Sequence, residues 1–165
     1  GLTGGFLPLA ATLASEEIYA EFLAEDRARA FFHGHSYTGN PVACAAALAS
    51  LRLFEQERSL ERVAGLERLF ARRLARLAAL PGVAATRGLG GLAVAELAPA
   101  SEPGYLDPRG PRVARALAER GIFVRPLGDV VYLLPPYCAT DAECDAVFDA
   151  LEEVLPGVAG VAQRG

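Results

Sequence analysis

The feature of this sequence that most constrains its fold is a long helical pattern that stops at a proline. From Ser59 onward, apolar side chains recur three or four residues apart, and the pattern ends at Pro81-Gly82. The apolar stripe consists of Leu60, Val63, Leu66, Phe70, Leu74 and Leu77. Such a helix is stable when its stripe is buried against other elements.

The segments that follow are short and alternate in type. Residues 83–97 predict two strands around a glycine-rich turn, and residues 111–120 predict a short helix. Residues 122–136 have the form of a hairpin of two apolar strands. Thr140 and Glu143 then offer a capping box for a last amphipathic helix. Together these segments predict a compact α+β unit.

The part of the chain before this unit is less regular. Residues 6–14 form a short apolar run that could be a buried strand, and residues 15–30 are predicted to be helical with Ser15 as the N-cap. Asn40-Pro41 supplies an N-cap and a proline at the first helical position, which is a strong start signal. The pattern over residues 41–80 is compatible with one kinked helix or with two helices.

The composition excludes several classes of function. A net charge of −4 at pH 7 argues against nucleic acid or an anionic membrane as the main partner, and no apolar run approaches the roughly 20 residues of a membrane span. The three cysteines follow no recognisable pattern, which suits a reducing cytoplasm. The chain contains no lysine, so it provides neither a Walker-A phosphate loop nor a Schiff-base lysine of its own.

Two places in the sequence could bind a ligand. In the loop at residues 33–39, the two histidines are too few for a metal site, and we predict none. The hydroxyl groups, glycine backbone and adjacent helix start of this loop suit an anion, although a simple capping turn explains them as well. Arg125 ends an apolar segment and could bind a carboxylate, either of a substrate or in a salt bridge, and Tyr132, across the predicted hairpin, could face the same site or belong to the core.

Three segments in order resemble the class III pyridoxal-phosphate-dependent aminotransferases. These segments are GLTGGFLPLAATL, HGHSYTGNPVACAAALASL and GIFVRPLGDVVYLLPPY. The resemblance is greatest to the subgroup of adenosylmethionine–8-amino-7-oxononanoate aminotransferases of biotin biosynthesis. It implies an α/β chain, the C-terminal part of the transferase fold type I. Residues 1–58 would end the large cofactor-binding domain, and residues 59–165 would form the small α+β domain.

The resemblance also implies roles for individual residues. His35 and Ser36 would bind the phosphate of pyridoxal 5'-phosphate, and they would act in trans, on the cofactor of the other subunit of a homodimer. Gly34, Arg125 and Tyr132 would contact substrate, with Arg125 on the carboxylate of the keto acid. The Schiff-base lysine is expected just before Gly1, so the isolated chain is expected to be an inactive fragment that contains no catalytic residue.

The activity that the resemblance implies is amino transfer to 8-amino-7-oxononanoate, which gives 7,8-diaminononanoate. The donor is a small molecule, S-adenosylmethionine or lysine, and Tyr132 favours S-adenosylmethionine. Another class III aminotransferase, acting on ω-amino acids or diamines, is one alternative. A non-catalytic stand-alone domain is the other, and the lack of lysine is its best support. We expect a cytoplasmic protein that binds neither nucleic acid nor membrane.

Overall fold

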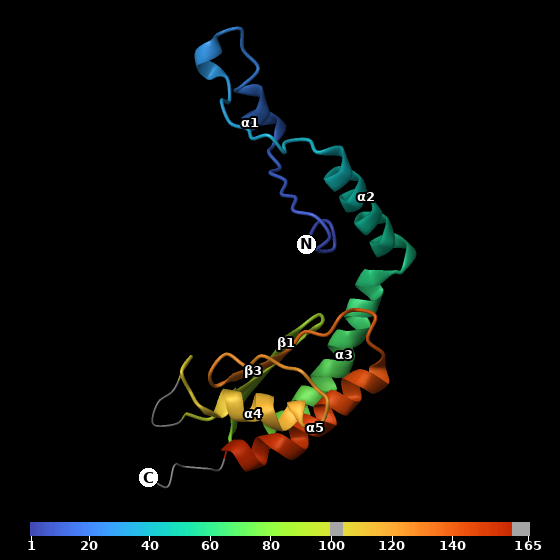
Figure 1. Ribbon diagram of the computed structural model, residues 1–165, viewed down its shortest axis with the longest axis vertical. Coiled ribbons are helices and arrows are strands. Elements are labelled where there is room, and N and C mark those ends of the chain that lie inside the picture. The colour runs from blue at the N-terminus through green and yellow to red at the C-terminus, as the bar shows by residue number, and fades with distance from the viewer. Residues whose placement is uncertain (100–103, 160–165) are drawn as a thin grey trace. The chain divides into compact units, whose positions relative to one another are not determined.

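The structure, a computed structural model, describes residues 1–99 and 104–159 (Figure 1). The chain forms two compact units, residues 1–58 and residues 59–165, and each is described by itself. Among the described residues, no helix is long and apolar enough to cross a membrane.

The first unit is built around one long helix. Its elements are α1 (Glu16–Ala20), a short 3-10 helix (Arg27–Arg29) and α2 (Pro41–Gln56). The predicted start of α2 is confirmed, because the Asn40 side chain accepts hydrogen bonds from the backbone N–H groups of Val42 and Ala43. Ser15 likewise caps α1 by accepting from the N–H group of Ile18.

Two predictions for the first unit are wrong. The helix expected over residues 15–30 ends after Ala20, and only a 3-10 turn follows it. A helix this short needs tertiary packing, and α1 buries none of its residues. The strand expected at residues 6–14 does not form either, because this exposed segment has no strand beside it to pair with.

The first unit buries very little of its apolar surface. Among residues 1–58, only Thr3 and Ala43 are buried. The exposed large apolar side chains of this unit are Leu2, Phe6, Leu7, Leu13, Ile18, Tyr19, Phe22, Leu23, Phe31, Phe32, Tyr37, Val42, Leu48, Leu51, Leu53 and Phe54. By itself this unit therefore lacks the hydrophobic core that stabilises a domain.

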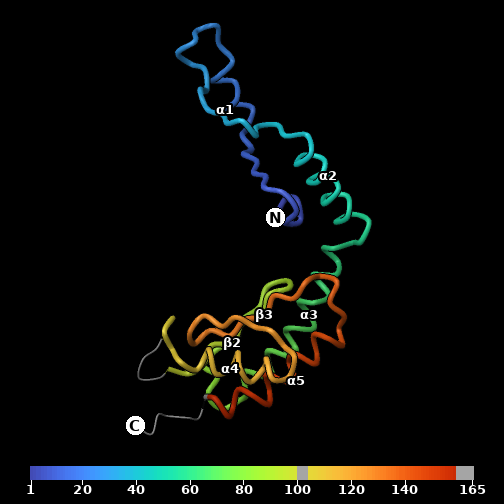
Figure 2. The backbone as a smooth tube through the Cα atoms, viewed as in Figure 1, coloured from blue at the N-terminus to red at the C-terminus, as the bar shows by residue number. Residues whose placement is uncertain are grey.

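The second unit combines three helices with a small sheet (Figures 1 and 2). Its elements are α3 (Ser59–Ala78), β1 (Val83–Leu89), β2 (Leu92–Leu97), α4 (Arg109–Ala118), β3 (Val130–Leu133) and α5 (Asp141–Ala159). The sheet is antiparallel in the order β1-β2-β3. The question left open by the sequence is answered: residues 41–80 form two helices, and Arg58 between them has a positive φ of 51°.

The hairpin predicted over residues 122–136 is wrong. Only its second half is a strand, and β3 pairs with β2, with Tyr132 opposite Val94. Residues 122–126 stay outside the sheet. A tight turn joins them to β3, in which the N–H groups of Leu127 and Val130 each donate to the carbonyl of the other.

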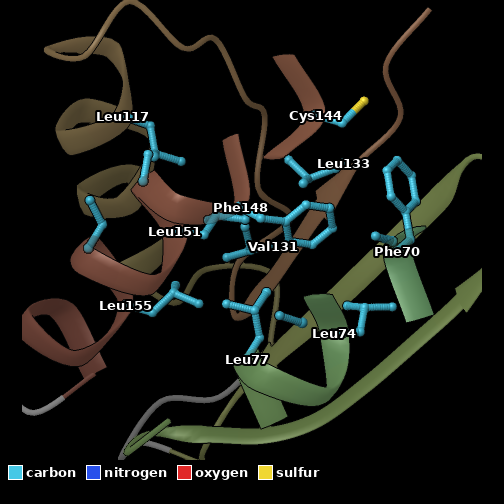
Figure 3. Close-up of a cluster of buried hydrophobic side chains, with 14 of the residues drawn as sticks. Phe70, Leu74, Leu77, Leu117, Val131, Leu133, Cys144, Phe148, Leu151 and Leu155 are labelled. Carbon is cyan, nitrogen blue, oxygen red and sulfur yellow. The ribbon is translucent and has the colours of Figure 1, made fainter. Parts of the chain in front are cut away.

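The core of the second unit lies where α3, α4 and α5 pack on the sheet. Figure 3 shows side chains from all of these elements pointing toward one another. Phe70 of α3 meets Phe148 of α5 edge to face, with ring centroids 5.3 Å apart. The Arg73 guanidinium lies 5.6 Å from the Phe148 ring centroid and pairs with Glu152 at 3.1 Å, so α3 and α5 are joined by both apolar and charged contacts.

A buried ion pair lies at the start of α4. The side chains of Asp107 and Arg109 are almost fully buried, and the Arg109 Nε lies 3.0 Å from Asp107 Oδ1. The Asp107 carboxylate also accepts a hydrogen bond from the backbone N–H of Arg109, 2.9 Å away. The hydrogen bond from the Arg109 side chain lowers the pKa of Asp107 below its ordinary value.

This pair predicts a specific loss of stability in acid. The pKa of Asp107 is lower in the folded state than in the unfolded state, so the ionised carboxylate adds to the free energy of unfolding. This stabilisation is fully present above the pKa of Asp107 in the unfolded chain, about 3.9, and is lost as the pH falls through its pKa in the folded protein. At pH 7, Asp107→Asn should lower the free energy of unfolding of the second unit by about 3–5 kcal/mol. Urea unfolding at several pH values should show this difference narrowing below about pH 4.

The matched control is Asp141→Asn. Asp141 also pairs with an arginine, Arg62, but its side chain is 64% exposed, so its removal should change the free energy of unfolding by at most about 1 kcal/mol. If the free energies of unfolding of Asp107→Asn and the parent differ by the same amount from pH 7 to pH 2, the stabilising role of the ionised Asp107 carboxylate is contradicted.

Candidate functional site

The loop before α2 is closed by its own polar groups. The backbone N–H of Tyr37 donates to the Nδ1 atom of His35, 3.1 Å away. The backbone N–H of His35 donates to Thr38 Oγ1 at 3.2 Å, and the N–H of Thr38 donates to the carbonyl of His35 at 3.0 Å. His35 therefore organises the loop, and its Nε2 atom has no hydrogen-bond partner among the described residues. No three His, Cys, Asp or Glu residues in the described part of the chain are grouped so as to hold a metal ion.

Ser36 lies at the exposed tip of this loop. Neither its hydroxyl nor its backbone N–H has a partner among the described residues. The loop leads directly into the N-terminus of α2, where the helix dipole favours negative charge. Free donors beside a helix N-terminus fit a phosphate group. Gly34 is exposed in the same loop, and the nearest atom to a Cβ added there would be Thr38 Oγ1, 4.0 Å away.

The second unit contains a largely apolar pocket of about 430 Å³. Its lining includes Arg125 and Tyr132, together with apolar residues such as Phe148 and Leu133. The sequence placed Arg125 and Tyr132 at one site through a hairpin that does not form, yet both line this pocket. Arg125 is exposed and has no hydrogen bond or ion pair among the described residues, so its guanidinium is available to an anion.

Two other ionisable groups of the pocket, Glu143 and Cys144, are not available in this way. Glu143 accepts hydrogen bonds from the backbone N–H and hydroxyl of Thr140, at 2.7 and 2.8 Å, and the first of these lowers the pKa of Glu143. This is the predicted capping box of α5. Burial raises the pKa of the Cys144 thiol, which therefore stays neutral and packs as an apolar group. Arg125 is thus the group in the pocket that can attract a carboxylate.

One wall of the pocket is held in place by an arginine on α3. The side chain of Arg62 donates to the backbone carbonyls of Tyr137 and Ala139 and pairs with Asp141 at 2.5 Å. These contacts fix the segment between β3 and α5, which includes the pocket residue Pro136. Arg62 therefore supports the site without lining it.

The polar groups that support the pocket are not among the predicted site residues. Asp107 lies outside every element predicted from the sequence, although Asp-Pro immediately before a helix is a start signal that could have located it. The contacts of Arg62 join residues about 75 positions apart in the sequence, and helical spacing gives no signal for them. Gly34, His35 and Ser36 belong to the first unit, and Arg125 and Tyr132 to the second.

Comparisons with known proteins give a consistent result. A family model described as aminotransferase class-III matches residues 1–155. An adenosylmethionine-8-amino-7-oxononanoate aminotransferase from Synechococcus elongatus is 47% identical, over 94% of this chain and 36% of that protein. The crystal structure of the enzyme of that name from Methanocaldococcus jannaschii matches with a TM-score of 0.84 at 42% identity, over 95% of this chain and 37% of the other. An amine transaminase from an uncultivated Pseudomonas species, in a PLP-bound form, matches with a TM-score of 0.81 at 31% identity, over 97% and 37%.

The chain thus spans about a third of the length of the proteins it matches. Over this span the predicted fold class is confirmed: the chain is the C-terminal part of the α/β fold of pyridoxal-phosphate-dependent transferases of fold type I.

The support that Arg62 gives to the pocket wall can be tested directly. Arg62→Met keeps most of the apolar stem but removes every donor, so the free energy of local opening around residues 137–141 should fall by about 1–2 kcal/mol. Hydrogen exchange of these amides measures that opening. Arg68→Met, on the exposed side of the same helix, should leave their exchange unchanged. Equal protection in the Arg62 variant and the parent would contradict the role of Arg62.

Proposed function

This chain belongs to the class-III aminotransferases, and we propose that the protein of which it forms part transfers an amino group to 8-amino-7-oxononanoate, giving 7,8-diaminononanoate in biotin biosynthesis. The relatives at 42–47% identity that bear the corresponding name support this proposal. The observation on which it chiefly depends is the unpaired guanidinium of Arg125 at an apolar pocket.

The acceptor in this reaction is well matched to that pocket. 8-Amino-7-oxononanoate has a carboxylate at one end of an apolar chain and its ketone near the other. Arg125 would bind the carboxylate through two parallel N–H donors, which fixes the orientation of the chain as well as its charge. Tyr132, which lines the same pocket, would contact substrate beside it. With its far end held, the acceptor would present its ketone for reaction.

Ser36 would bind the phosphate of pyridoxal 5'-phosphate. Its hydroxyl and backbone N–H are free, the adjacent helix N-terminus favours the phosphate charge, and His35 keeps the loop in shape. When bound, the cofactor supplies the electron sink for amino transfer. The Schiff-base lysine has to come from outside these residues, because the chain contains none.

The first unit supports the assembly that we propose, a homodimer in which this loop reaches the cofactor of the partner subunit. Nearly all its large apolar side chains are exposed, including Val42, Leu48 and Leu51 on α2. Surface of this kind is normally covered in a stable protein. The rest of the polypeptide and a second subunit would cover it together. The protein would act in the cytoplasm on small-molecule substrates.

A second candidate is an amine or ω-amino-acid aminotransferase. The amine transaminase matched at 31% identity over 97% of this chain supports it. Rates on 8-amino-7-oxononanoate and on simple diamines separate the two candidates. For the amino donor we favour S-adenosylmethionine over lysine. Measuring the rate of the first half-reaction of the whole enzyme with each compound in turn would show which of them donates the amino group.

The role of Arg125 is tested with the whole enzyme. Arg125→Gln should lower kcat/KM for 8-amino-7-oxononanoate by about 30- to 100-fold, because a charge-assisted bidentate contact is lost. The methyl ester of the same acceptor has no carboxylate to lose, so its kcat/KM should change by less than about threefold. Arg115→Gln, an exposed arginine on α4, is the matched control. Equal losses on the acid and the ester would exclude carboxylate binding by Arg125.

The role of Ser36 is tested by cofactor affinity. Ser36→Ala should weaken binding of pyridoxal 5'-phosphate to the whole apoenzyme by about tenfold, since one hydrogen bond to a charged group is removed. Ser36→Thr keeps the hydroxyl and should restore most of the affinity. Equilibrium dialysis gives both constants, with Ser15→Ala as the control hydroxyl deletion. If Ser36→Ala binds the cofactor as tightly as the parent, the assignment fails.

A further inference from the structure

Arg125 lies on a segment that the sheet does not hold. In the described part of the chain, the backbone of residues 123–126 makes no hydrogen bond. Ile122 and Val124 pack against the core, whereas Phe123 and Arg125 point outward, with Phe123 91% exposed. Strand pairing therefore does not fix the position of the Arg125 guanidinium, which depends on the packing of Ile122 and Val124 and on how the two ends of the segment are attached.

Both ends of this segment are attached to α4. At the first end, the N–H of Ile122 donates to the carbonyl of Leu117 in the last turn of α4, 3.0 Å away. At the second end, the Gly128 carbonyl lies against Gly110 in the first turn. Figure 2 shows the orange segment running back along α4.

The contact between α4 and the turn requires glycine at position 110, and the contact between the turn and the chain at Gly104 requires glycine at position 128. A Cβ on Gly110 would overlap the carbonyl oxygen of Gly128 and come within 3.3 Å of Pro126 Cβ. Gly128 has a φ of 63°, and a Cβ there would overlap the carbonyl oxygen of Gly104. The N–H of Gly104 also donates to the Asp129 carboxylate, 3.1 Å away. The turn after Arg125 is therefore held between α4 and the chain at Gly104.

The start of α4 is itself held in place. Asp107 and Arg109 form the buried pair described above, immediately before Gly110. The Asp107 carboxylate accepts from the backbone N–H of Arg109 and so fixes the first turn of the helix. A rigid first turn keeps Gly110 against Gly128.

We propose that Gly110 is a positioning residue for substrate binding: its contact with Gly128 fixes the turn that follows Arg125 and thereby aims the Arg125 guanidinium at the substrate carboxylate. This inference rests on the proposed function, since it takes Arg125 as the carboxylate-binding group. Gly110 itself touches no substrate. A larger side chain at position 110 displaces the turn and so moves the Arg125 guanidinium away from the position of the substrate carboxylate, while its charge is kept.

The test is Gly110→Ala in the whole enzyme, with two measurements. The first is kcat/KM for 8-amino-7-oxononanoate relative to its methyl ester. This preference should fall at least fivefold, through KM for the acid, while kcat stays within about twofold. The second is hydrogen exchange of the Ile122 and Leu127 amides, the two in this segment that donate hydrogen bonds, and their exchange should become at least tenfold faster. Asp107→Asn, which loosens the first turn without adding an atom at the contact, should change both quantities in the same direction by less.

Leu69→Ala on α3 is the control for a general loss of stability, because Leu69 is buried in the core and does not line the pocket. It should lower the melting temperature while leaving the acid-to-ester preference and the exchange of the Ile122 and Leu127 amides unchanged. The proposal is overturned if Gly110→Ala leaves the preference for the acid over the ester unchanged. It is also overturned if Leu69→Ala reduces this preference as much as Gly110→Ala does. If Arg125→Gln keeps the full preference for the acid, the proposed function fails instead, and the exchange measurement still shows whether Gly110 holds the segment.

Discussion

The pairing of β3 with β2 is the contact on which the rest of the second unit depends. It uses one edge of β3, and residues 122–126 do not pair with the other edge but lie outside the sheet. The N–H of Ile122 donates to the carbonyl of Leu117 on α4, and the Gly128 carbonyl lies against Gly110 at the other end of that helix. Arg125 lies between these two attachments and lines the pocket with a guanidinium that has no partner among the described residues.

The ionisable side chains that line the pocket differ in their hydrogen-bond partners and in their burial. The Glu143 carboxylate is occupied by the cap of α5, and burial keeps the Cys144 thiol neutral. The Arg125 guanidinium has no ion-pair partner among the described residues and lies beside apolar walls. The groups that give the pocket this character, including Arg62 and the Asp107–Arg109 pair, mostly act on backbone and lie away from the ligand.

The two units differ in how much stability they can contribute alone. In the second, a core shared by three helices and the sheet buries the stripe of α3, and the aromatic pair of Phe70 and Phe148 joins α3 to α5. In the first, a well-capped helix and a closed loop stand among exposed apolar side chains. Local hydrogen bonds are enough to shape the loop around Ser36, but the surface beside it needs a partner.

The sequence by itself determined the elements whose signals are local. Asn40-Pro41 started α2, the stripe from Leu60 to Leu77 gave α3, and Thr140 with Glu143 capped α5. Only the tertiary structure decided the strand partners, the end of α1, and the neighbours of Arg125. Spacing along a chain shows which face of a segment is apolar, because that follows from helix and strand geometry. It does not show which distant segment satisfies a backbone group, because that choice depends on how the whole core packs.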